Sequence, residues 1–382
     1  MITFEAVTKR YPDGTVAVDA LDLEVPAGKT VVLVGPSGCG KTTSLRMINR
    51  LVEPSSGRIL LDGTDIRDRN QAQLRRGIGY VIQQTGLFPH RTVEDNIATV
   101  PVLTGLSRRK ARDRARELLT LVGLDPALAK RYPHQLSGGQ QQRVGVARAL
   151  AADPPVLLMD EPFSAVDPVV RASLQDQLLL LQAELRKTIV LVTHDIEEAI
   201  KVGDLVALFR PHGKIAQLAP PDELLASPAD DYVAGFVGFD RGIRRLSFVS
   251  TGQLTLGTGP VFTTDATVAK ARAGGEPWIL VTEEGTGRAR GWVDAARLAG
   301  QPDGGTLGKL AADGIGHSFT AGTDSLRAAL DAAVLSPAGQ AVAVDGEGRV
   351  LGVATFDQLR AAIQAAGQTE DESQAQGAGQ RP

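Results

Sequence analysis

The residue types that phosphate chemistry needs gather first in a glycine-rich segment, GPSGCGKTT at residues 35–43. It follows a β-branched run at 30–34 and precedes apolar residues at helical spacing. In such a loop, backbone N–H groups and the helix start bind phosphate oxygens, the lysine reaches the β- and γ-phosphates, and a threonine ligates Mg²⁺. The predicted nucleotide-binding residues are Gly35, Pro36, Ser37, Gly38, Cys39, Gly40, Lys41, Thr42 and Thr43.

Two adjacent carboxylates end a short apolar run, VLLM at 156–159. We expect Asp160 to lie beside the phosphate loop and to hold Mg²⁺ together with Thr42. Strand geometry predicts that Glu161 points the other way, where it can activate water as a general base. The alternative for both residues is a solvated acidic pair at the end of a strand.

A second loop of small residues precedes another helix, about 95 residues after the lysine. It consists of Ser137, Gly138, Gly139 and Gln140. Its N–H groups and hydroxyl form a second cradle for an anion, although many loops that open a helix look the same. Since one chain holds one nucleotide, we expect a head-to-tail homodimer in which each second loop covers the partner's nucleotide.

The elements around these loops alternate between strand and helix. Strands are expected at 30–34, 58–61, 78–83, 156–159, 188–193 and 205–210, and helices at 108–122, 139–151, 167–186 and 196–201. A further helix is expected after Gly40, with Leu45, Ile48 and Leu51 at helical spacing and Pro54 at its end. This alternation predicts an α/β phosphate-loop fold with a mainly parallel sheet between helices. The helical stretch at about 86–152 is then an insertion.

The character of the chain changes at about residue 240, where glycine and alanine become more frequent. Segments 279–298 and 342–359 resemble each other, and each reads as strand, acidic glycine turn, strand and helix. Each follows a threonine-aspartate pair, 264–265 or 323–324, which we interpret as a helix start. We therefore expect two small α+β modules, at about 245–305 and 310–366, and a disordered tail at 367–382.

Composition excludes several classes of protein. A net charge of −3 over 382 residues offers no polyanion-binding surface, so we expect no nucleic-acid partner. The one cysteine, Cys39, fits a reducing compartment and a small residue of the loop. We expect neither a signal peptide nor a membrane span, because no stretch approaches the roughly 18 apolar residues that a bilayer requires.

Residues 1–237 resemble the ATP-binding cassette of ABC transporters. The segments that carry this resemblance are GPSGCGKT, LSGGQ, VLLMDE and the histidine in VTHD. The resemblance implies ATP and Mg²⁺ as cofactors, and His194 at the γ-phosphate. It makes Gln83 in YVIQQ a catalytic and Mg²⁺-sensing glutamine, with Gln84 as the alternative. Tyr11 would stack on adenine, and Asp167, in the loop at 164–167, would bridge two protomers or cap a helix. The alternative for Tyr11 is a turn residue.

The two C-terminal modules resemble tandem cystathionine-β-synthase (CBS) modules. GVATFD at 352–357 resembles the ribose-contacting G-x-x-T-x-D stretch, whereas GWVD at 291–294 lacks the threonine. The resemblance implies an adenine-nucleotide or cyclic-dinucleotide ligand, and a purely structural pair is the alternative. A cassette followed by such a pair resembles the ATPase subunits of quaternary-amine osmoprotectant importers.

This resemblance implies an ATPase on the cytoplasmic face of the cell membrane, held there by permease subunits and served by an extracytoplasmic solute-binding protein. The cargo would be glycine betaine, carnitine or choline. One alternative is an importer of another solute, such as an amino acid, because the cassette does not touch cargo. Another is a soluble ABC ATPase of DNA repair or translation. A binding-only protein fits poorly, since Lys41, Asp160, Glu161 and His194 are all present.

Overall fold

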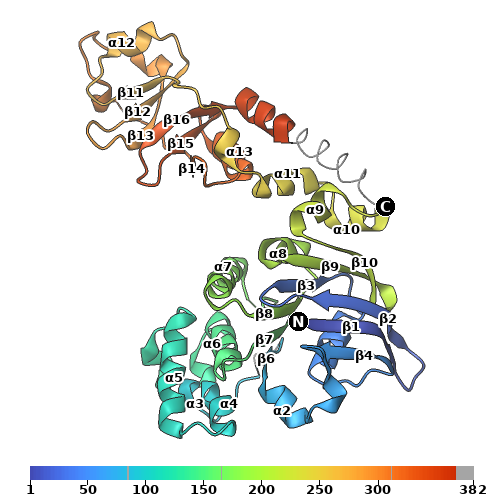
Figure 1. Cartoon of the computed structure of the whole chain (residues 1–382). Helices are drawn as coiled ribbons and strands as arrows, with labels where there is room; N and C mark the ends of the chain where they lie inside the picture. The colour runs from blue at the N-terminus through green and yellow to red at the C-terminus, as the bar shows by residue number, and fades with distance from the viewer. Residues whose placement is uncertain (84–85, 165, 311, 367–382) are drawn as a thin grey trace. The chain divides into compact units, whose positions relative to one another are not determined.

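The computed structural model describes residues 1–83, 86–164, 166–310 and 312–366. The chain divides into two compact units, Met1–Phe239 and Asp240–Pro382. The division falls where the composition of the chain changes. Each unit is described by itself, with the element labels of Figure 1.

The first unit is built on a six-stranded sheet with the order β10-β9-β3-β8-β7-β6 in the described residues. All neighbours are parallel except β9 and β10. The strands are β3 (Thr30–Val34), β6 (Ile78–Val81), β7 (Val156–Asp160), β8 (Thr188–Val192), β9 (Leu205–Arg210) and β10 (Lys214–Ala219). Because parallel strands end at one edge, the segments after β3, β6, β7 and β8 meet there.

A second, antiparallel sheet has the order β2-β1-β4-β5. Its strands are β1 (Ile2–Arg10), β2 (Val16–Val25), β4 (Ser56–Leu61) and β5 (Thr64–Asp65). Its apolar face shares a core with β3 and with helix α1 (Lys41–Ile48). The phosphate loop therefore lies between two layers that pack against each other.

The helices that follow α1 in this unit are α2 (Gln71–Arg76), α3 (Val93–Ile97), α4 (Thr99–Leu103), α5 (Arg108–Leu121), α6 (Gly138–Leu150), α7 (Pro168–Leu185), α8 (Ile196–Val202), α9 (Pro221–Ala226) and α10 (Asp231–Val237). The predicted ranges of α5, α6, α7 and α8 agree with these bounds to within one residue, whereas α2, α9 and α10 were not predicted. Figure 1 shows α3 to α6 gathered into one block beside β6.

The expectation that α1 continues to Pro54 is wrong. The helix ends at Ile48, because Arg50 takes a left-handed backbone with φ of 56°. Leu51 therefore lies outside the helix and is 49% exposed.

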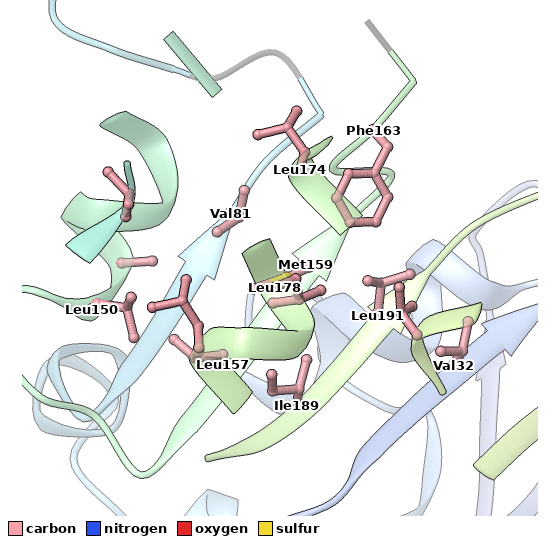
Figure 2. Packing of buried hydrophobic residues seen from close by; sticks show 14 of the residues in the cluster. Val32, Val81, Leu150, Leu157, Met159, Phe163, Leu174, Leu178, Ile189 and Leu191 are labelled. Atoms are coloured by element: carbon pink, nitrogen blue, oxygen red, sulfur yellow. The ribbon is translucent and has the colours of Figure 1, made fainter. Parts of the chain in front are cut away.

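Apolar side chains from four parallel strands and from α7 form one buried cluster beside the sheet edge that carries the site. It includes Val32, Val81, Met159 and Leu191 of the strands, and Leu174 and Leu178 of α7 (Figure 2). Burying one such side chain stabilises the fold by about 1.5–3 kcal/mol. The ends of β3, β7 and β8 are therefore held rigidly, which a catalytic site requires.

The second unit contains two small sheets with the same topology, which agrees with the repeat seen in the sequence. Their orders are β11-β12-β13 and β14-β15-β16, each with a parallel pair followed by an antiparallel pair. The elements are α11 (Arg241–Arg245), β11 (Val261–Thr263), α12 (Val268–Ala273), β12 (Trp278–Thr282), β13 (Ala289–Asp294), β14 (Ser318–Thr320), α13 (Leu326–Leu335), β15 (Gln340–Val344) and β16 (Val350–Thr355).

Two details of the repeat differ from expectation. The helices begin two to three residues later than the threonine-aspartate pairs, because Thr267 and Ser325 cap them through their hydroxyls. Asp324 instead accepts a hydrogen bond from the Thr320 backbone. The first copy ends in a short 3-10 turn at Ala295–Leu298, whereas residues 356–366 of the second are helical.

The two modules complete each other's sheets. Gly257, which precedes β11, pairs with Val353 in β16, and Asp313, which precedes β14, pairs with Trp292 in β13. Trp292 and Val353 also share a buried cluster with Leu280, Val342 and Val344.

No helix in the described part of the chain is long and apolar enough to cross a bilayer.

Candidate active site

The phosphate loop joins β3 to α1, and its backbone requires glycine. Gly40 has φ of 105°, and a Cβ there would lie 2.3 Å from the carbonyl oxygen of Ala17. The Lys41 ammonium donates hydrogen bonds to the carbonyl oxygens of Gly35, over 2.7 Å, and Pro36, over 2.9 Å. The lysine is thus held within the loop, and its binding to phosphate stays a prediction.

A turn after β9 supports this loop from outside. The backbone N–H of Gly213 donates to the carbonyl oxygen of Cys39 over 2.7 Å. Burial raises the pKa of the Cys39 thiol, and the ammonium of Lys41, 3.7 Å from its sulfur, opposes that rise only in part. The thiol is therefore a packed part of the loop rather than an activated nucleophile.

The end of β7 brings a carboxylate to the start of α1. The Thr42 hydroxyl donates to Asp160 Oδ1 over 2.9 Å, and Arg46 lies 3.4 Å from Oδ2. Asp160 is only 3% exposed. One hydroxyl and one carboxylate form an oxygen donor set that fits Mg²⁺, an ion that usually keeps waters and phosphate oxygens as its other ligands.

Glu161 lies at the meeting point of three strand ends. Its carboxylate accepts a hydrogen bond from the Gln83 side-chain amide over 3.0 Å, and His194 Nδ1 lies 3.5 Å from its other oxygen. Strand alternation was expected to set the direction of the Glu161 side chain, but Glu161 does not belong to the strand. β7 ends at Asp160, and Glu161 takes a left-handed backbone with φ of 46°. That turn, fixed by its N–H donating to Val192 O, aims the carboxylate.

Gln83 also differs from its predicted place. β6 ends at Val81, so Gln83 lies in the loop rather than at the end of the strand. Its contact with Glu161 brings it into the site all the same. Gln84, the alternative, lies outside the described residues.

The two acidic residues have environments that suit different tasks. Asp160 is buried between a hydroxyl and a guanidinium and can act as a ligand. The Glu161 side chain is 23% exposed and contacts an amide and an imidazole, so it can receive a proton from a water molecule. Geometry therefore supports a division of labour between ion binding and proton transfer.

The remaining predicted residues occupy helix starts and the loop margin. Tyr11, half-buried, places its hydroxyl 3.5 Å from that of Thr43. Ser137 and Gln140 form a capping box at the start of α6, each accepting a hydrogen bond from the other's backbone N–H. Two N–H groups of the second cradle, those of Ser137 and Gln140, are thus already used. Asp167 caps α7 through Val169 N and Val170 N.

Sequence reasoning missed three charged residues next to the site. Arg46 contacts Asp160 from one turn inside α1. Arg171 and Glu198 lie 3.6 Å apart, on α7 and α8. Burial raises the pKa of the Glu198 carboxyl, which the Thr193 hydroxyl and Arg171 oppose without cancelling. The spacing from His194 in THDIEEA was the available signal for Glu198.

Comparison with known proteins identifies the family of the chain. A family model described as ABC transporter matches residues 18–164. The osmoprotectant import ATP-binding protein OsmV of Salmonella typhimurium is 55% identical over 260 residues, 67% of this chain and 68% of that protein. This chain belongs to the family of ABC transporter ATP-binding proteins. It is an ATPase whose hydrolysis is coupled to transport.

Two further ABC relatives cover similar shares of the chain. The glycine betaine/carnitine/choline transport ATP-binding protein OpuCA of Bacillus subtilis is 50% identical over 272 residues, 71% of each chain. The glycine betaine uptake system ATP-binding protein YehX of Escherichia coli is 52% identical over 254 residues, 66% of this chain and 82% of that protein.

Solved structures show the same cassette fold. The dimeric bacterial ABC transporter cassette MJ0796 is 35% identical, with a TM-score of 0.54 over 58% of this chain and 99% of that one. The same cassette in a post-hydrolysis dimer bound to ADP and Pi gives a TM-score of 0.53 at the same identity, over 58% of this chain and 99% of that one. The cassette fold of this chain therefore has a similar solved structure that is bound to ADP and Pi.

Proposed function

We propose that this chain powers the uptake of quaternary-amine osmoprotectants such as glycine betaine, carnitine or choline. The observation that carries the proposal is the extent of similarity to relatives with such names. The match to the carnitine transport ATP-binding protein OpuCA of Listeria monocytogenes runs over 303 residues at 45% identity. Because the first unit ends at Phe239, that similarity continues into the second unit.

The test is ATPase activity of the complete complex, with its permease and solute-binding protein, against a panel of quaternary amines and amino acids. Stimulation by glycine betaine, carnitine or choline, and not by amino acids, is the expected result. Stimulation by amino acids alone would contradict the cargo but leave the ATPase assignment intact.

Hydrolysis would take place where Glu161 faces the phosphate loop. Glu161 receives the proton of the attacking water, and Gln83 and His194 orient that carboxylate relative to the γ-phosphate. Lys41 and the loop N–H groups bind the phosphates. Thr42 and Asp160, together with Gln83, would hold Mg²⁺, which supplies positive charge to the phosphate oxygens.

The second cradle would act in trans, within a homodimer. Ser137 and Gly138 are exposed at the start of α6, and Asp167 is exposed at the start of α7. The similar cassette MJ0796 is dimeric, which supports this arrangement. Mixing Lys41→Ala chains with Ser137→Arg chains should restore activity that neither has alone, because one intact composite site forms. No recovery from folded, mixed chains would contradict the dimer.

A groove of about 510 Å³ in the helical block would receive the permease at the cytoplasmic face of the membrane. It is lined by apolar side chains, among them Phe88, Val102 and Leu103, and rimmed by Arg91 and Arg112. Leu103 is 60% exposed and Phe88 39%. Apolar side chains exposed in a hollow are typical of surfaces that bind a helix.

The second unit would regulate transport as a pair of CBS modules, by sensing ionic strength or by binding an adenine nucleotide or cyclic dinucleotide. Its two sheets share one topology, and Thr355 caps the final helical segment through Gln358. Deleting residues 240–382 should preserve basal ATPase activity and change its osmotic response. An unchanged response would contradict regulation by this unit.

A further inference from the structure

Glu198 is a buried carboxyl that the hydrolysis described above does not use. It lies on α8, is 5% exposed, and accepts a hydrogen bond from the Thr193 hydroxyl over 2.6 Å. Thr193 immediately precedes His194, and its own hydroxyl accepts the backbone N–H of Asp195. The carboxyl therefore holds the backbone on both sides of the histidine.

The guanidinium of Arg171, in the first turn of α7, connects this carboxyl to another loop. Its Nε lies 3.6 Å from Glu198 and one terminal nitrogen lies 3.9 Å from Asp195. The other terminal nitrogen donates to Val166 O over 3.5 Å. Val166 belongs to the loop that leads to Asp167. One side chain thus joins the segment after β7 to the segment after β8.

The His194 side chain needs such support, because it is 59% exposed and has little packing to fix it. A cavity of about 50 Å³ is lined by Glu161 and His194 together with Arg171 and Glu198. Arg171 Nε is buried and has no hydrogen-bond partner among the described residues. It faces Glu198 at a distance slightly too long for a hydrogen bond, so a small movement of α7 would make or lengthen this contact.

We propose that Arg171 and Glu198 are positioning residues that hold His194 against Glu161 and connect it to the loop ending at Asp167. The proposal rests on the roles given above to Glu161 and His194. Its consequence is that contact made by Asp167 with a partner copy reaches the histidine of its own chain through α7. A displacement of about 1 Å in such a site can reduce the rate about a hundredfold.

The test uses the full-length chain and measures kcat and KM for ATP. Arg171→Ala should lower kcat about tenfold or more while KM changes less than about threefold. Arg171→Lys should recover part of kcat, since it keeps a cation beside Glu198. Glu198→Gln should lower kcat similarly, and Arg171→Ala added to it should cost little more, because both changes remove one connection.

Lys201→Ala is the matched control. Lys201 and Asp176 form an exposed ion pair, 2.7 Å long, that joins the same two helices away from the site. Lys201→Ala should keep the wild-type kcat. Its melting temperature should lie within a few degrees of that of Arg171→Ala. An equal loss of kcat in Lys201→Ala, or an unchanged kcat in Arg171→Ala, would overturn the proposal.

Trapping of the ATP-bound dimer separates the steps. In a Glu161→Gln background, Arg171→Ala should still give an ATP-dependent dimer on size exclusion, because binding is left intact. Loss of that dimer would place Arg171 in nucleotide binding and overturn the positioning role. Wild-type hydrolysis by Glu161→Gln alone would instead contradict the proposed function of the site.

Discussion

The side-chain amide of Gln83 donates a hydrogen bond to the carboxylate of Glu161 over 3.0 Å. Gln83 follows β6 and Glu161 follows β7, so two neighbouring parallel strands deliver the pair. The glutamine lies in the loop that leads to the groove proposed for the permease. A shift of that loop would therefore change the environment of the Glu161 carboxylate.

Replacing Glu161 with Gln should reduce ATP turnover by at least about a hundredfold, because an amide cannot accept the proton of the attacking water. ATP binding should persist and an ATP-bound dimer should accumulate. Turnover is checked by phosphate release and the dimer by light scattering. Glu184→Gln, on an exposed part of α7, is the control and should behave as wild type.

Asp160→Asn should raise the Mg²⁺ concentration needed for half-maximal activity by about tenfold or more, since it removes the carboxylate that accepts the hydrogen bond of the Thr42 hydroxyl. The shape of the side chain is preserved, so the fold should tolerate the change. A Mg²⁺ titration of ATPase activity makes the measurement. Asp222→Asn, exposed at the start of α9, should leave the titration unchanged.

Cys39 should report on nucleotide binding. Because burial raises the pKa of its thiol, little thiolate is present at pH 7, and alkylation by N-ethylmaleimide should be slow. Its rate should increase about tenfold per pH unit below the pKa, since the thiolate fraction does so. ATP should protect the thiol. Mass spectrometry follows the reaction, and equal rates with and without ATP would contradict its place in the nucleotide loop.

Leu103→Asp should weaken copurification with the permease and leave the ATPase activity of the isolated chain unchanged. The reason is that a charge in the groove of the helical block must be desolvated when an apolar partner docks. Leu180→Asp is the control, because Leu180 is 72% exposed on α7 and does not line the groove. Equal effects of both changes would contradict the docking site.

The sequence predicted most of the fold and the phosphate loop of the site, because local rules govern both. Asp167 followed by proline opens α7 where a cap and a first-turn proline should. The phosphate loop combines glycines with a strand before it and a helix after it, and its geometry follows from those neighbours. The tandem modules were visible as a repeated order of strands and turns.

Other features depend on tertiary packing, which no local pattern encodes. The contact of Arg171 with Glu198 exists only because α7 and α8 lie side by side. The direction of Glu161 follows from a left-handed turn, whereas strand alternation predicted it from the wrong geometry. The capping box of Ser137 and Gln140 was likewise not foreseen, although its residue types are those of a helix start.

The crossed pairing in the second unit sets a limit on how that unit can change. Gly257 pairs with the sheet of the later module, and Asp313 pairs with the sheet of the earlier one. Each sheet is therefore completed by a segment from outside its own module. Cutting between them would open both ladders at once. The two halves should therefore melt together in one transition, and a distortion of either module should be transmitted to the other.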